Sequence, residues 1–139
     1  MTVRPLQHCG VFFVIIRKVH NIMILINTSN NSIISENVEI ADSYFKRLIG
    51  LMCTQELSVN NALHIIPCSS IHTFFMNYSI DVIYLDMNNR IIHIDEGIEP
   101  KKIGRWVKNA RSVVELPNGK VKNSQIMVGQ VVAFLDRVI

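Results

Sequence analysis

Residues 65–86 read IIPCSSIHTFFMNYSIDVIYLD, and this most apolar stretch of the 139-residue chain decides the predicted fold. Pro67 cannot continue a helix, and its ring pushes Ile66 toward extended geometry. After a turn at 67–70, the run Ile71–Met76 predicts a strand with alternating faces. A few polar side chains within apolar strands are typical of a partly buried site, and also of an ordinary core whose polar groups are hydrogen-bonded.

A β-hairpin is predicted immediately afterwards, over residues 80–95. Ile, Val and Tyr dominate both arms, and Asn88-Asn89 suits a tight turn that requires positive φ angles. With those two residues as the loop, Ile83 faces Ile94. A change of one residue in the loop would reverse the faces.

The flanking sequence adds short strands and two helices. A change to helical spacing of the apolar residues predicts an amphipathic, core-facing helix at about 41–52, which Asp42 can cap and which ends near Gly50. A second short helix is predicted at about 118–125, and Trp106 is expected to be held against the core. Seven or so short strands with two short helices predict a mainly β domain, either a β-sandwich or a partly closed barrel. Beyond the central stretch, the predicted strands lie at residues 23–27, 32–39, 63–66, 112–116 and 131–135.

Composition indicates one folded domain. The chain is 49% hydrophobic and 18% charged, which is typical of a globular protein, and its length suits a single core. Because Met23 opens the first clear strand, we expect the domain to span 23–139 and residues 1–22 to be an extension, either a disordered tail or a start-site artefact. An export signal is the less favoured alternative, because basic residues follow the apolar patch 11–16 and no cleavage site is present. No run approaches the ~18 apolar residues that a membrane span needs.

The three cysteines, Cys9, Cys53 and Cys68, are odd in number and irregularly spaced. This pattern argues against a disulfide framework and favours a reducing compartment, which predicts a cytoplasmic protein.

The formal net charge is a modest +3. Five basic residues form a loose cluster, Lys101, Lys102, Arg105, Lys108 and Arg111. A nucleic-acid groove is usually denser and interleaved with exposed aromatic residues, so we expect a solvated surface and no nucleic-acid partner.

His64, Cys68 and His72 lie four residues apart, which on a helix would align them for a metal. On an extended strand, four residues span about 13 Å, whereas zinc bonds to these side chains are about 2.0–2.3 Å long. No metal site and no cofactor are therefore predicted. A thiolate–imidazole pair of Cys68 and His72, or a relay of Ser70, His72 and Asp81, would be a nucleophilic arrangement, but no sequence motif supports either.

Among the candidate residues, Asp81 is the one for which the sequence most strongly indicates a specific role. A carboxylate in an apolar strand must be hydrogen-bonded, paired with another charged group or exposed at the rim of the sheet. Its partner could be His72 from the preceding strand, or Glu96, which lies opposite in the predicted hairpin. A structural role is the favoured interpretation, with Asp81 accepting backbone N–H bonds that fix the turn at 76–80.

Four segments resemble a known family. They read ADSYFKRLIGLM, PCSSIHTFFMNYSIDVIYLD, VVELPNG and VGQVVAF, and in that order they resemble the prokaryotic family called domain of unknown function 192. The resemblance covers about residues 23–135 and implies a β-sandwich of jelly-roll type with peripheral helices. It implies no activity, because the family has no assigned biochemical function. The positions that match the family pattern are Arg47, Gly50, Leu51, Met52, His72, Thr73, Met76, Asp81, Glu115, Pro117 and Gly119.

The chain departs from the family pattern at a few places. Cys53-Thr54 stands where relatives often have an aromatic or small residue followed by Arg, and Asn77 replaces a common basic residue. Ser79 and Gln130 replace a common Pro and Asp. Because both basic groups are missing, the resemblance gives no support to anion binding.

Two hypotheses of different classes follow. The favoured one is a non-catalytic module that binds a small molecule or a partner protein at the open end of strands 71–95. The alternative is an enzyme, a hydrolase that uses His72 and Asp81 as an acid–base pair and Ser70 or Cys68 as the nucleophile. The sequence leaves open whether the chain is catalytic, which ligand or partner it takes, and its oligomeric state. The candidate ligand-binding residues are His72, Thr73, Asn77 and Asp81, with Cys68, Ser70, Arg47 and Glu96 as secondary candidates.

Overall fold

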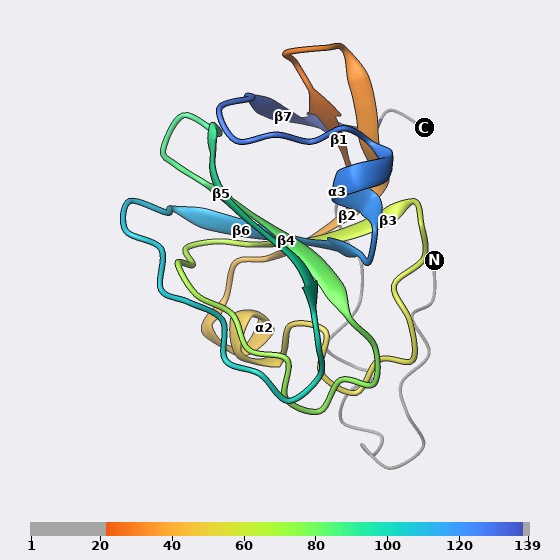
Figure 1. Ribbon diagram of the computed structural model, residues 1–139, viewed down its shortest axis with the longest axis vertical. Helices are drawn as coiled ribbons and strands as arrows, with labels where there is room; N and C mark the ends of the chain where they lie inside the picture. The colour runs from red at the N-terminus through yellow and green to blue at the C-terminus, as the bar shows by residue number, and fades with distance from the viewer. Residues whose placement is uncertain (1–21, 138–139) are drawn as a thin grey trace.

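The computed structural model describes residues 22–137, in which seven strands form one curled sheet with the shape of a half-barrel (Figure 1). Neighbouring strands are antiparallel, except β2 and β3, which run parallel. Across the sheet the order is β5-β4-β6-β3-β2-β1-β7. In chain order the elements are β1 (Met23–Asn27), β2 (Ser32–Ala41), α2 (Tyr44–Ile49), β3 (Asn61–Ile65), β4 (Ile80–Leu85), β5 (Ile91–Ile98), β6 (Ser112–Pro117), α3 (Lys120–Asn123) and β7 (Val132–Asp136).

The predicted mainly β architecture is confirmed, in the form of a partly closed barrel. The jelly-roll detail is not confirmed, because the described strands all belong to a single sheet. The second predicted helix is present as α3, although it is shorter than expected. The expectation about an N-terminal extension falls, apart from residue 22, outside the described residues.

The sheet is buried on both faces. Side chains alternate along a strand, so β4 sends Ile83 and Leu85 into one core and Val82 and Tyr84 into another. All six residues of β4 are buried for this reason. The first core contains Leu25, Ile34, Val38, Ala62, Ile83, Leu85, Ile91, Val114, Leu116, Val121, Ile126 and Val132. The second core contains Ala41, Leu51, Leu63, Ile65, Ile71, Met76, Ile80, Val82, Tyr84 and Val113.

The predicted hairpin is formed by β4 and β5, and Ile83 pairs with Ile94 as expected. The loop itself differs, because the backbone N–H of Asp86 donates to the carbonyl of Arg90 at 3.0 Å and so closes a three-residue turn. Asn89 takes the positive φ of 58° that the turn requires. A register shift between Tyr84 and Leu85 pairs Leu85 with Ile91 and leaves Ile83 opposite Ile94.

The strand predicted at Ile71–Met76 is wrong. These residues lie in a long connection between β3 and β4, where His72 makes a bridge with Ile103. Phe75 has a φ of 62°, which interrupts extended geometry. The connection crosses the second core, into which Ile71 and Met76 are buried, so the apolar residues pack without forming a strand.

The helix α2 is shorter and more exposed than predicted. Ser43, rather than Asp42, caps it by accepting a hydrogen bond from the Lys46 N–H at 3.2 Å. Gly50, with a φ of 47°, ends it as expected. No residue of α2 is buried, so the prediction of a core-facing helix is wrong. The core contact comes instead from the residue that follows the glycine, Leu51.

Two further expectations are wrong. Trp106 is exposed to 68% rather than held against the core. Cys53 is disulfide-bonded, whereas Cys68 has a free thiol. The cysteines therefore give no support to a reducing compartment.

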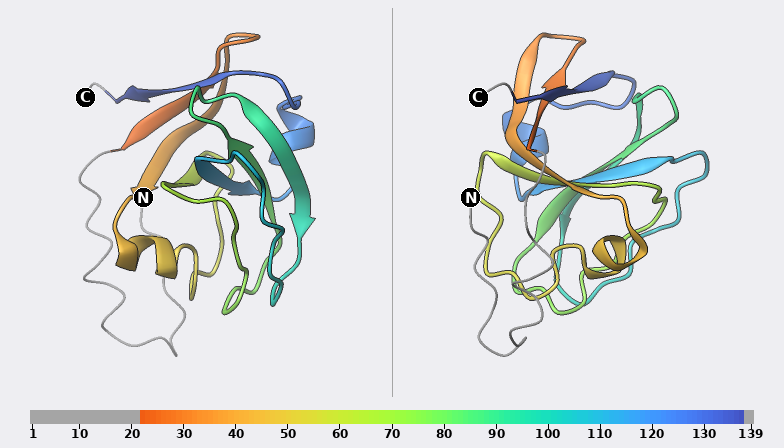
Figure 2. Two further views of the ribbon diagram at one scale, coloured as in Figure 1. Left: turned by 90° about the vertical axis from the view of Figure 1, so that its left-hand side faces the viewer. Right: turned by 180° about the vertical axis from the view of Figure 1, so that it is seen from behind.

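Two long connections and α2 gather at one end of the molecule, away from β1 and β7 (Figure 2). The connections are residues 66–79, between β3 and β4, and residues 99–111, between β5 and β6. Together they cover the second core, and they bring most of the residues that the sequence singled out to this end.

Candidate functional site

A pocket of about 280 Å³ lies beneath α2, and it contains most of the polar candidate residues on this side of the sheet. Its walls come from α2, from β3 and β6, and from the first part of the 66–79 connection. The polar residues that line it are Arg47, Cys68, Ser70, His72 and Glu115, and the apolar ones include Leu48, Leu51, Ile65 and Ile71.

Glu115 brings a carboxylate from the sheet to the pocket. Its neighbours across the ladder are Leu63 on β3 and Val82 on β4, both of which face the second core. The side chain is only 2% exposed. A methyl group on Gly50 would lie 4.0 Å from Glu115 Oε2, so the end of α2 closely approaches the carboxylate. A carboxylate so deep in an apolar face must be compensated by nearby polar groups.

Arg47 brings a cation to the same pocket from the last turn of α2. One guanidinium nitrogen, Nη1, donates to the carbonyl of Asp42 at 3.2 Å, which holds the side chain along the helix. Because a guanidinium has five N–H donors, this single bond leaves several for other partners. The helix thus presents a positive group near the carboxylate that β6 supplies.

Cys68 has a thiol that is suited to donating a hydrogen bond rather than to acting as a nucleophile. Its Sγ donates to the carbonyl of Ser70 at 2.9 Å. Burial raises the pKa of the Cys68 thiol, and the nearby Glu115 carboxylate raises it further, whereas the Ser70 backbone bond and Arg47 act in the opposite direction. Reactive cysteines have a lowered pKa. The neutral thiol is therefore the stable form in this pocket.

His72 lies at the rim of the pocket and is held from two sides. Its ring stacks on Phe74 at a centroid distance of 5.6 Å, and its backbone bridges to Ile103. Within the described part of the chain, the buried Nδ1 has no hydrogen-bond partner. Buried polar atoms are nearly always hydrogen-bonded. An unpartnered ring nitrogen in a residue that lines a pocket is a feature that a bound group would satisfy.

Asp81 has a different position and a structural set of partners. It is fully buried, and its two carboxylate oxygens accept from the N–H of Gly97 at 2.9 Å and of Val121 at 3.0 Å. It alternates with Val82, so it points toward the first core, whereas the pocket lies on the side of the second core. The carboxylate joins β4 to β5 and to the first turn of α3, and it does not reach His72.

The other candidates are also placed outside the pocket. Thr73 is buried and its Oγ1 donates to the carbonyl of Glu99 at 2.6 Å while it accepts from the Lys102 N–H at 2.9 Å. Asn77 and Glu96 are exposed. A register shift between Ile80 and Val82 places both Glu96 and Gly97 opposite Asp81. The hydrogen bond to the Asp81 carboxylate is donated by the backbone N–H of Gly97.

The structure therefore brings Arg47, Cys68, Ser70 and His72 together. Sequence reasoning did not name Glu115 as a site residue, although the argument made for Asp81 applies equally to a glutamate within the apolar run VVELP. It also lies at a position that matches the family pattern.

Metal ligation finds no support among the described residues, which contain no group of three His, Cys, Asp or Glu side chains arranged to hold an ion. His64, which is spaced four residues from Cys68 in the sequence, faces the first core and stacks on Phe134 with centroids 4.1 Å apart. In residues 22–137, no helix has the length and apolar character that crossing a bilayer requires.

The fold and the pocket define a small half-barrel domain with a largely apolar cavity, carrying a few polar groups, under α2. The chain belongs to the family DUF192, described as "Uncharacterized ACR", which it matches over residues 25–134.

Relatives and solved structures agree with this assignment. A UPF0127 protein from Pyrococcus horikoshii is 37% identical over 100 residues, which cover 68% of this chain and 84% of the relative. One from Thermococcus sibiricus is 35% identical over 111 residues, covering 76% and 70%.

Two crystal structures have the same fold. A Sinorhizobium meliloti protein that carries the provisional name of transcription regulator has a TM-score of 0.71 at 19% identity, covering 82% of this chain and 92% of that one. A protein of unknown function from Novosphingobium aromaticivorans has a TM-score of 0.70 at 18% identity, covering 81% and 83%.

Proposed function

We propose that this protein is a non-catalytic module that binds a small molecule in the pocket beneath α2. The observation that carries the proposal is the convergence of Arg47, His72 and Glu115 from three different elements on one cavity of about 280 Å³. Ligand sites are typically concave and largely apolar, with a few polar groups that fix the orientation of the ligand. The lining of this pocket has that composition.

The ligand class follows from the lining. The volume of about 280 Å³ is just below the usual range for small-molecule sites, which favours a small metabolite over a nucleotide cofactor. Arg47 would recognise a carboxylate, for which a guanidinium has the matching geometry. Ile65 and Ile71 would contact an apolar portion. A small carboxylate with an aliphatic or aromatic part is therefore the proposed ligand.

The hydrolase alternative has less support. It requires His72 to reach a carboxylate and a nucleophile, yet Asp81 is bonded to Gly97 and Val121 on the other side of the sheet. The Cys68 thiol has a raised pKa and donates to the Ser70 carbonyl, and the Ser70 hydroxyl donates to the carbonyl of Gly104 at 3.2 Å. Among residues 22–137, neither nucleophile is paired with a general base.

A thermal-shift screen of small carboxylates tests the proposal. We expect at least one compound to raise the Tm of the wild type and to have little effect on Arg47→Met, which keeps the alkyl stem and removes the charge. Arg111→Met is the matched control, because Arg111 is exposed and does not line the pocket. Equal responses from wild type and Arg47→Met, or stabilisation lost only in Arg111→Met, would refute the proposed site.

A further inference from the structure

The two long connections at the end of the molecule are held side by side by backbone hydrogen bonds. The Gly104 N–H donates to the carbonyl of Ile71 at 2.8 Å, and the Val107 N–H donates to the carbonyl of Ser69 at 2.9 Å. Thr73 adds two backbone bonds, with Lys101 and Lys102. We call residues 66–79 and 99–111 the paired loops. These bonds, with one from the Cys68 N–H to the Arg111 carbonyl at 3.0 Å, place residues 68–73 side by side with residues 101–111.

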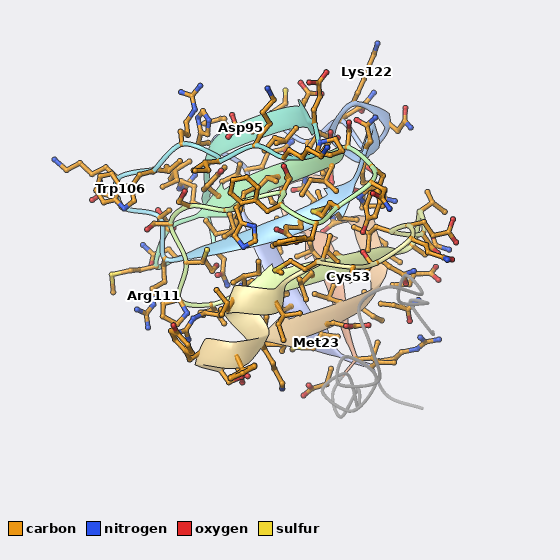
Figure 3. The ribbon with its side chains drawn as sticks, turned by 90° about the horizontal axis from the view of Figure 1, so that it is seen from below. Met23, Cys53, Asp95, Trp106, Arg111 and Lys122 are labelled. Atoms are coloured by element: carbon orange, nitrogen blue, oxygen red, sulfur yellow. The ribbon has the colours of Figure 1, made fainter. Side chains whose placement is uncertain are left out.

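Large apolar side chains project from the paired loops into solvent. Ile103 is 75% exposed, Trp106 68% and Phe75 67%. Figure 3 shows Trp106 pointing away from the body of the protein, on the same side as Arg111. Exposed apolar groups that gather on one surface mark a site of interaction, whereas single ones are ordinary.

The paired loops are also rich in exposed basic residues. Residues 99–111 contain five Lys and Arg and one acidic residue, Glu99, while residues 66–79 contain no acidic residue at all. The whole chain has fourteen Lys and Arg and eleven Asp and Glu, so nine basic and ten acidic residues remain outside this segment. One further carboxylate adjoins it, Asp95, which lies 3.6 Å from Arg105 Nε. The net positive charge of the protein thus arises from the paired loops.

We propose that the paired loops dock on the surface of an anionic lipid bilayer. Trp, Phe and aliphatic side chains partition into the interfacial region of a bilayer, and Lys and Arg are attracted to anionic headgroups. The protein carries both features on the same two loops. The positive charge complements the anionic headgroups, and the exposed apolar side chains can enter the interfacial region, so both features favour an anionic bilayer as the partner.

A nucleic acid fits the surface less well. Single strands are bound in basic grooves, where aromatic rings form flat platforms for the bases. Here the apolar side chains project outward, and the most exposed of the three is Ile103, an aliphatic residue on which a base cannot stack. A lipid interface accepts an aliphatic tip as readily as an aromatic one.

Trp106 is the single tryptophan of the chain, so its fluorescence reports directly on the proposed surface. The full chain is mixed with vesicles of phosphatidylcholine alone, or of phosphatidylcholine with phosphatidylglycerol. With the anionic vesicles, we expect a blue shift of the emission and quenching by brominated acyl chains, both weakened by salt. With the neutral vesicles, we expect neither. Unchanged emission in anionic vesicles would overturn the proposal.

A pair of matched variants locates the contact. Lys102→Gln on the paired loops should lower partitioning to the anionic vesicles about fivefold, which corresponds to about 1 kcal/mol per basic residue. Lys122→Gln on α3 should leave partitioning unchanged. Equal loss in both variants would show that overall charge, and not the paired loops, drives binding. A response of Trp106 to a single-stranded oligonucleotide in the absence of any response to vesicles would also overturn the proposal, in favour of nucleic acid.

Discussion

His64 provides a pH-dependent test of how the two cores are built. It lies on β3, faces the first core and is only 7% exposed. Its ring stacks almost parallel on Phe134, with an interplanar angle of 10°. Within the described residues its Nε2 has no hydrogen-bond partner. Burial lowers the pKa of His64 from 6.5 to about 4.

The sign and size of the effect follow from linkage. The pKa of His64 is lower in the folded than in the unfolded protein. Above pH 6.5 the histidine is neutral in both states and does not change the free energy of unfolding. As the pH falls from 6.5 toward 4, the free energy of unfolding decreases. In that window the unfolded chain binds a proton that the folded chain does not. With one pKa unit equal to about 1.36 kcal/mol, the free energy of unfolding falls by about 2 kcal/mol at pH 5 and about 3 kcal/mol at pH 4.

Urea unfolding of the wild type and of His64→Leu, followed by circular dichroism at pH 7, 6 and 5, measures this loss. The comparison removes the contribution of every other titrating group, since both proteins share them. We expect the wild type to lose about 2 kcal/mol more than the variant between pH 7 and pH 5. Parallel pH profiles for the two proteins would refute the assignment of a buried, neutral histidine at this position.

Three further predictions concern residues around the sheet and the pocket. Asp81→Asn should lower the free energy of unfolding by about 3 kcal/mol in urea titrations. The reason is that the amide places an N–H donor against the Val121 N–H, where the carboxylate oxygen accepts a hydrogen bond. A loss below about 0.5 kcal/mol, the size usual for a surface substitution, would contradict the structural role of Asp81. Cys68 should react with iodoacetamide at pH 7 more slowly than the same thiol in the urea-unfolded, non-reduced chain, because its pKa is raised by burial; faster reaction in the folded protein would revive the nucleophile hypothesis. Gly50→Ala should lower the free energy of unfolding by about 1–3 kcal/mol, because alanine is strained at the positive φ of this position. A steric clash does not contribute, since the added methyl meets no atom closer than 3.9 Å. An unchanged urea midpoint would show that the backbone is not strained there.

Local pattern predicted much of the sheet, because strand alternation and turn chemistry are properties of neighbouring residues. The pairing of Ile83 with Ile94 came from the hairpin sequence alone, and so did the placement of Asp81 on the same face as Ile83. The position of His72 could not be obtained in this way. Its connection packs across the second core through bonds to residues 101–111, and such long-range pairing leaves no periodic signal in the sequence.

The candidate site shows the same limit. His72 and Asp81 are nine residues apart in sequence, yet they lie on opposite faces of the sheet. Because β4 is buried on both faces, its sequence does not indicate which face the preceding connection covers. Glu115 follows the second connection, residues 99–111, in the sequence. It reaches the pocket because β6 pairs with both β3 and β4. The exposure of Trp106 was missed because an aromatic residue within a polar connection is usually a core contact, and nothing in its neighbours indicates otherwise.

Amide chemical-shift mapping of the ¹⁵N-labelled protein, with mixtures of small carboxylates added in turn, tests the central claim most directly. If the pocket beneath α2 is a ligand site, at least one mixture should move the signals of Gly50, Cys68 and His72 and leave that of Gly97, beside Asp81, in place. The response should disappear in Arg47→Met. Shifts confined to the β4–β5 end of the sheet, or no shift at the pocket with any mixture, would contradict the account.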